Sequence, residues 1–148
     1  MAIQKGKVVN NEARGDFTHY AIFTYEDIQD NATSSNQATI AQIPAGGAVE
    51  LVYVVEEEAL AGASDITLDV GTTGADPDEF IDNLDVDGMT VPVFNTGDAF
   101  STPEEITGET ASATDIVAEW NGTVGSLTAG KVGIYMRILD PSRFASAV

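Results

Sequence analysis

The chain has 148 residues, about the length of one domain, and it contains no cysteine. Disulfides, thiolate nucleophiles and cysteine-ligated zinc are therefore excluded. Its 24 acidic and 6 basic residues give a formal net charge of -18, which would repel nucleic acids and anionic membranes. Because the sequence has no apolar run of about 18 residues and no signal-peptide core, we expect no membrane span and synthesis in the cytoplasm.

The acidic residues are spread along the chain, whereas the basic residues lie near its two ends. No Lys or Arg occurs between Gly15 and Gly130, and every acidic residue except Glu12 and Asp140 lies in this interval. A dispersed excess of carboxylates with almost no Lys favours a solvated surface suited to high salt over a single cation-facing role. The composition is similar to that of proteins from halophiles.

Three strands are predicted in the first part of the chain. Apolar residues alternate with other residues over 17–25, which indicates the first strand. The polar segment 30–36 is expected to be a loop, and a second strand is expected over 38–43. A Pro-Ala-Gly-Gly turn at 44–47 leads into a third strand over 48–57. Because both faces of this third strand are apolar, we expect it to be central in its sheet and covered on both faces.

The middle of the chain carries weaker signals. Apolar and polar residues alternate over 66–70, which predicts a half-buried strand. Residues 77–84 are expected to form one helical turn, with Asp76 as its N-cap. The alternation over 89–93 predicts a further strand, and Pro92 restricts it to the edge of a sheet.

The last part of the chain carries the clearest strand signals. Residues 115–120 form an alternating run that points Trp120 toward the core, and Asn121-Gly122 is a tight-turn signal. The final strand is predicted over 131–138. The residues of this strand that we expect to face the core are Val132, Ile134, Met136 and Ile138.

Seven or eight short strands without a long helical period predict an all-β protein, an antiparallel β-sandwich. We expect the sandwich to span residues 17–140. An extended N-terminal arm at 1–16 would precede it, and a short tail at 141–148 would follow it.

The chain offers no assembled catalytic site, and we expect that it is not an enzyme. The only histidine, His19, alternates with Phe17 and Ala21 on the first predicted strand, which favours a half-buried structural role over that of a catalytic base. No nucleophile elbow, phosphate-binding loop or dinucleotide-binding glycine pattern is present. A glycosidase is disfavoured because Trp120 alternates like a core residue instead of marking an aromatic cleft.

The densest acidic segment, at 69–87, is the candidate metal site. Asp76, Asp78 and Asp82 could supply oxygen ligands to Ca²⁺ or Mg²⁺, which are bound by carboxylates in glycine-containing loops. The spacing does not match an EF-hand. The alternative, which we favour, is a solvated segment that needs no cofactor.

The N-terminal arm is the predicted protein-binding segment. It carries Lys5, Lys7 and Arg14, half of the basic residues of the chain. A basic arm on an acidic molecule can anchor to an acidic neighbour, and the alternative is a terminus without a docking role. The acidic run at 56–58 is interpreted as the end of a strand that enters a solvated turn, or alternatively as a patch for a basic partner.

Four segments together resemble small virion proteins of tailed viruses. They read Ile-Pro-Ala-Gly-Gly-Ala-Val-Glu-Leu-Val-Tyr-Val-Val-Glu-Glu-Glu at 43–58, Ile-Thr-Leu-Asp-Val-Gly-Thr at 66–72, Asp-Pro-Asp-Glu-Phe-Ile-Asp at 76–82 and Ala-Gly-Lys-Val-Gly-Ile-Tyr-Met-Arg at 129–137. The resemblance covers roughly residues 37–138. It implies a jelly-roll-like sandwich that decorates or cements a capsid shell by binding the major capsid protein.

The resemblance further implies a protein of the virion surface, made in the host cytoplasm, that forms a symmetric homo-oligomer, with a trimer favoured. It brings no catalytic residues. The extreme acidity departs from the family pattern and fits a virus of a halophilic archaeon. Two alternatives remain open: a tail, neck or fibre-base component of a virion, and a calcium-dependent carbohydrate-binding module.

Overall fold

The computed structural model describes residues 17–34, 37–72, 78–94, 96 and 112–140. These parts of the chain form eight strands, one α-helix and one 3₁₀-helix. In chain order the elements are β1 (His19–Thr24), α2 (Tyr25–Ser34), β2 (Gln37–Ile43), β3 (Ala48–Ala61), β4 (Thr67–Thr72), β5 (Ile81–Asp85), β6 (Val93–Phe94), β7 (Thr114–Asn121), η3 (Val124–Ser126) and β8 (Ala129–Leu139).

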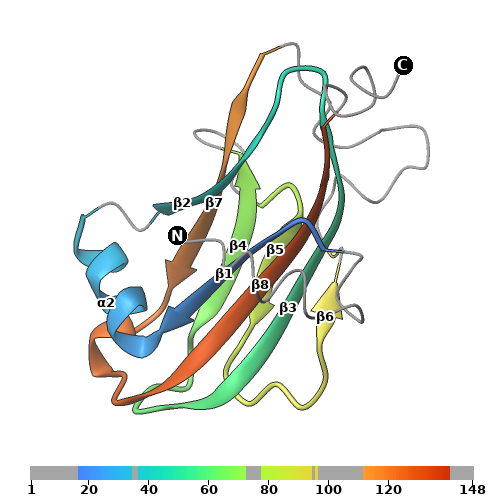
Figure 1. Cartoon of the computed structure of the whole chain (residues 1–148). Coiled ribbons are helices and arrows are strands. Elements are labelled where there is room, and N and C mark those ends of the chain that lie inside the picture. Colours follow the sequence, from blue (N-terminus) through green and yellow to red (C-terminus); the bar gives the residue numbers. More distant parts are fainter. Residues whose placement is uncertain (1–16, 35–36, 73–77, 95, 97–111, 141–148) are drawn as a thin grey trace.

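The strands form two antiparallel four-stranded sheets that pack face to face (Figure 1). The first sheet has the order β1-β8-β3-β6, and the second has the order β2-β7-β4-β5. The first strand therefore pairs with the last, the second with the seventh, the third with the sixth and the fourth with the fifth. The expectation of an antiparallel β-sandwich is confirmed, and this nested pairing is the order expected when one long hairpin is rolled up into two sheets.

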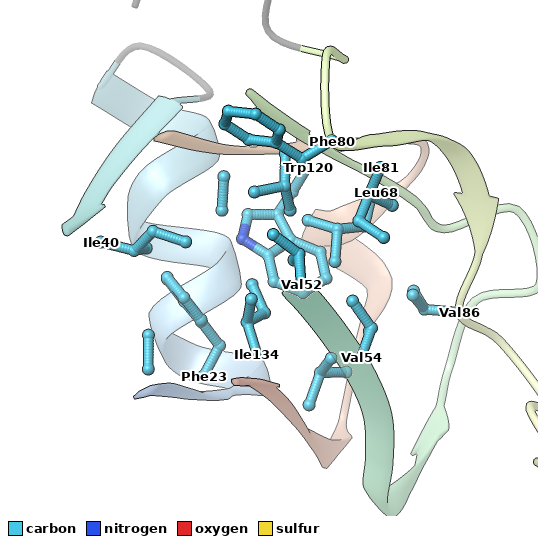
Figure 2. Close-up of a cluster of buried hydrophobic side chains, with 14 of the residues drawn as sticks. Phe23, Ile40, Val52, Val54, Leu68, Phe80, Ile81, Val86, Trp120 and Ile134 are labelled. Carbon is cyan, nitrogen blue, oxygen red and sulfur yellow. The ribbon is translucent and has the colours of Figure 1, made fainter. Parts of the chain in front are cut away.

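The core lies between the sheets and follows from side-chain alternation along the strands (Figure 2). Trp120 on β7 is fully buried, and its ring meets Phe23 on β1 edge-on with 5.3 Å between ring centroids. This contact joins one strand of each sheet. The predicted inward face of the last strand is confirmed, since its four residues are all buried: Val132, Ile134, Met136 and Ile138.

The helix α2 was not predicted, because no helical stripe of apolar residues is visible in its sequence. Among its residues whose side chains the structure describes, Ile28 alone is apolar and fully buried. The helix begins with a capping box. The backbone N–H of Thr24 donates to Asp27 Oδ2 at 3.0 Å, and the Asp27 N–H donates to Thr24 Oγ1 at 3.3 Å. This Thr-x-x-Asp pattern was the available sequence signal. The predictions of a strand to residue 25 and a loop from residue 30 are therefore wrong.

The side chain of Gln29 attaches α2 to the 3₁₀-helix near the C-terminal end of the fold. Its Nε2 atom lies 3.1, 3.3 and 2.9 Å from the carbonyl oxygens of Val124, Gly125 and Leu127. The helix α2 and the 3₁₀-helix η3 together cover the end of the sandwich where β1 leads into β2 (Figure 1). Neither helix of the described residues is long and apolar enough to cross a membrane.

Three other expectations need correction. The helical turn predicted at 77–84 is wrong, because residues 81–85 pair with β4 as strand β5; Asp76 and Pro77 lie outside the described residues. The acidic run 56–58 lies within β3, which continues to Ala61 because β8 offers pairing partners along that length. The predicted edge strand at 89–93 is reduced to two residues, Val93 and Phe94, although it does lie at a sheet edge.

Candidate interaction surfaces

The second sheet carries an acidic surface centred on Asp69 of β4. The carboxylate of Asp69 accepts a hydrogen bond from the backbone N–H of Asn83 at 2.5 Å and another from Asn121 Nδ2 at 3.1 Å. Asn83 adopts a left-handed backbone conformation with φ of 47°, which asparagine tolerates better than most residues. These bonds hold Asp69 between the neighbouring strands β5 and β7.

Other carboxylates surround Asp69. Partial burial raises its pKa above the ordinary value of 3.8, and repulsion from Asp78, Glu119 and Asp82 raises it further, against the lowering effect of the Asn83 hydrogen bond. No lysine or arginine lies on β4, β5 or β7. These three strands therefore carry acidic residues and no basic ones, and the fold brings several of the carboxylates close to Asp69.

The structure places two of the three predicted metal ligands. Asp78 is half-buried just before β5, and Asp82 is exposed on β5. Asp76 lies outside the described residues. Among the residues that the structure describes, no three acidic or histidine side chains are grouped closely enough to hold a metal ion. The metal site at Asp76, Asp78 and Asp82 stays a prediction.

The first sheet carries a different surface on its outer side, formed by the aromatic row Phe17, Tyr20, Tyr53 and Tyr135. Tyr20 of β1 and Tyr53 of β3 are each paired in register with Tyr135 of β8. The ring centroids of Tyr20 and Tyr53 lie 6.0 and 6.1 Å from that of Tyr135. Cross-strand aromatic pairs of this kind stabilise a sheet.

Phe17 joins the aromatic row from outside the strand. Its ring centroid lies 5.6 Å from those of both Tyr53 and Tyr135. The sequence analysis placed Phe17 on the same face of the first strand as His19 and Ala21, which is wrong. Strand β1 begins only at His19, so the alternation that orients Ala21 and Phe23 toward the core does not extend to Phe17.

Tyr135 is the most buried member of the aromatic row. Its hydroxyl group donates a hydrogen bond to the carboxylate of Glu57 on β3. Gly133 gives the ring its space, because a Cβ atom at that position would lie 2.8 Å from Tyr135 Cε2. Only 5% of the Tyr135 surface is exposed, although the ring lies on the side of the sheet that faces away from the core.

Charged groups flank the aromatic row. Arg137 Nε lies 2.7 Å from Glu50 Oε2, and both side chains are partly exposed.

The predicted protein-binding residues Lys5, Lys7 and Arg14 lie outside the described residues. Sequence reasoning missed the aromatic row as a unit, because its four members come from three strands and the segment before β1. The alternation of side chains along each strand was the only sequence signal that could have placed these rings on the outer face.

The single histidine belongs to neither surface. His19 is half-buried at the start of β1, and its Nδ1 atom lies 2.8 Å from the hydroxyl oxygen of Thr18. The same hydroxyl oxygen accepts a hydrogen bond from the backbone N–H of Ile138 at 2.9 Å. These contacts agree with the predicted structural role of His19.

Comparison with known proteins shows a similar fold. No protein-family model matches the chain, and no curated protein is similar to it in sequence. A chain of the solved cyanophage Pam1 capsid asymmetric unit superposes with a TM-score of 0.52 and 17% sequence identity. The match covers 80% of this chain and 79% of the other. At this identity the likeness concerns the fold, and it extends over most of both chains.

Proposed function

We propose that this protein is a structural component of a virion, and that it decorates or cements a capsid shell by binding the major capsid protein. The observation that carries the proposal is the likeness in fold to a chain of a cyanophage capsid unit over 80% of the sequence. The sequence resemblance to small virion proteins of tailed viruses points in the same direction and was drawn from different features. A fold alone does not determine function, so binding has to be measured.

The physical features of the chain suit such a role. The two sheets enclose a continuous apolar core that includes Trp120 and Phe80, which are both fully buried, and this gives a rigid body. A cement acts by mass action, because a protein that binds the assembled shell but not its separated subunits stabilises the assembly. The nested strand order supports the jelly-roll form of the sandwich.

The acidic surface of the second sheet suits a saline medium. The carboxylates of Asp78, Asp82 and Glu119 repel that of Asp69, and concentrated salt screens this repulsion. This surface fits a virion exposed to a saline medium and a host among halophilic archaea.

The proposed oligomer is a symmetric trimer, in which each copy buries part of its surface against the next. Light scattering of the purified protein at high salt measures this state directly.

Cosedimentation tests the binding proposal. The purified full-length protein is mixed at high salt with undecorated capsids of its virus, and the bound copies per shell are counted. We expect saturation at a copy number that matches a set of symmetry-related positions. An unrelated protein of similar negative charge serves as the control for trapping. Failure to bind at any concentration would exclude a cement and direct attention to the tail, neck and fibre base of the virion.

A further inference from the structure

We propose that a β-bulge at Asp82 and Asn83 protects the edge of the second sheet, and that it keeps a second copy of this chain from pairing with strand β5. In the order β2-β7-β4-β5 this strand is the last, and its outer side pairs with no other strand of the described residues (Figure 1). An edge strand of this kind is a template for pairing with another chain unless a bulge, charged side chains or short length prevents it. The inference is independent of the proposed role in a virion.

The bulge consists of two residues of β5 that stand opposite one residue of β4. The register between the strands shifts between Leu68 and Val70, so that Asp82 and Asn83 both lie opposite Asp69. Asn83 has φ of 47°, outside the range of a regular strand. An extra residue bends the strand and increases its local twist, so β5 cannot run straight beside another strand.

The carboxylate of Asp69 holds the bulge in place. It accepts a hydrogen bond from the backbone N–H of Asn83 at 2.5 Å, and its second oxygen accepts from Asn121 Nδ2 at 3.1 Å. The N–H of Asn83 therefore has its acceptor within the same chain and is not offered to an incoming strand. Asp69 is itself fixed between two neighbouring strands, which makes this acceptor a rigid one.

Exposed carboxylates add a second barrier along β5. Asp82 and Asp85 are both exposed, and the strand has only five residues. Two copies that paired antiparallel with Asp82 opposite Asp85 would place like charges directly against each other, twice by symmetry. Salt at 1 M screens charges beyond about 3 Å, whereas it leaves the bulge unchanged. The bulge thus protects the edge in concentrated salt, where charge alone protects it least.

Deletion of Asn83 tests the protection. It leaves Asp82 alone opposite Asp69, so that β5 can pair with β4 residue by residue. The test variant combines this deletion with Asp82→Thr and Asp85→Thr, and the control variant carries the two substitutions alone. Both variants have the same net charge and share every other surface, so association through those surfaces is common to both. Sedimentation equilibrium of the full-length proteins in 1 M KCl gives the two association constants.

We expect the test variant to associate at least about tenfold more tightly than the control variant. Hydrogen exchange at the β5 amides should slow in the associated form, because a second strand then covers them. Equal association constants would overturn the proposal. Tighter association without slower exchange in β5 would also overturn it, since another surface would then hold the copies together.

A second pair of variants keeps the chain length unchanged. The change Asn83→Val disfavours the left-handed conformation and should open the bulge, whereas Asn83→Gly preserves that conformation and is its matched control. Each change is combined with Asp82→Thr and Asp85→Thr, and the emission of the buried Trp120 shows that the variants are folded. We expect the valine variant to associate more tightly than the glycine variant. Equal association of these two would contradict the proposal, whether or not the deletion variant folds.

Discussion

The carboxylate of Asp65 accepts hydrogen bonds from both the backbone N–H and the hydroxyl group of Thr123, at 3.1 and 2.5 Å to Oδ1. Asp65 lies just before β4, and Thr123 lies between β7 and η3. The two hydrogen bonds thus join two loops that are 58 residues apart in the sequence. They require that the backbone at Gly122 lies close to the backbone at Asp65.

The change Gly122→Ala should destabilise the protein strongly. Gly122 has φ of 104°, and a Cβ atom there would lie 2.2 Å from the carbonyl oxygen of Asp65. Both the left-handed conformation and the contact oppose a side chain, so we expect a loss of more than about 1 kcal/mol in the free energy of unfolding. Urea unfolding followed by the emission of Trp120 measures this loss. The control Gly125→Ala should change stability little, because nothing lies within 4 Å of its Cβ position; equal losses would contradict the steric explanation.

The change Asp65→Asn should lower stability at neutral pH and have no effect in acid. Hydrogen bonds from Thr123 lower the pKa of Asp65 below the ordinary value of 3.8. A lowered pKa in the folded state contributes stability above pH 3.8, and this contribution disappears as the pH falls through the lowered pKa. Thermal unfolding of parent and variant between pH 7 and pH 2 tests this directly. A difference in melting temperature that does not shrink in acid would refute the assignment.

The change Asp69→Asn should raise stability at neutral pH, the opposite of the effect expected for Asp65→Asn. Burial and the nearby carboxylates raise the pKa of Asp69, so its ionised form opposes folding at neutral pH. The parent protein loses this penalty as the pH falls toward 3.8, whereas the variant never has it. We therefore expect the variant to melt at a higher temperature than the parent at pH 7, and the difference to disappear only below pH 3.8, where the carboxyl group is protonated in both the folded and the unfolded chain. The oxygen of the introduced amide can still accept from the backbone N–H of Asn83. A variant less stable than the parent at pH 7 would show that the two hydrogen bonds outweigh the repulsion.

The change Gln29→Met should loosen helix α2 from the 3₁₀-helix. It removes the amide that bonds the carbonyl groups near Val124 and Leu127, with a loss of about 1–2 kcal/mol for a partly buried donor. Hydrogen exchange of the α2 amides should accelerate together with the loss of stability. Gln42→Met is the matched control, since the Gln42 side chain is exposed and its amide bonds the carboxylate of Asp115. Equal effects of the two substitutions would argue against the attachment.

Salt should stabilise the protein. The net charge of -18 makes the folded chain repel itself, and the Debye length falls from about 10 Å at 0.1 M to about 3 Å at 1 M. We expect the melting temperature to rise over this range of KCl concentration. An uncharged solute at the same osmolality controls for exclusion effects. An unchanged melting temperature would contradict adaptation of this surface to high salt.

Which side chains of the clearest strands face the core could be predicted from the sequence. Alternation between the two faces depends only on the pleat of the backbone, so the inward positions of Val132 and Ile134 could be read directly. The prediction failed where alternation ended or was absent. Phe17 lies before the strand begins, and helix α2 buries too few apolar residues to produce a visible period.

Which strands lie next to one another could not be predicted from the sequence and became clear only from the folded chain. Tyr20 and Tyr135 are 115 positions apart in the chain, yet they lie side by side because the first strand pairs with the last. The carboxylates around Asp69 likewise come from two other strands and one turn. Such contacts depend on how the whole chain closes its core, whereas the local pattern of each strand records only its own two faces.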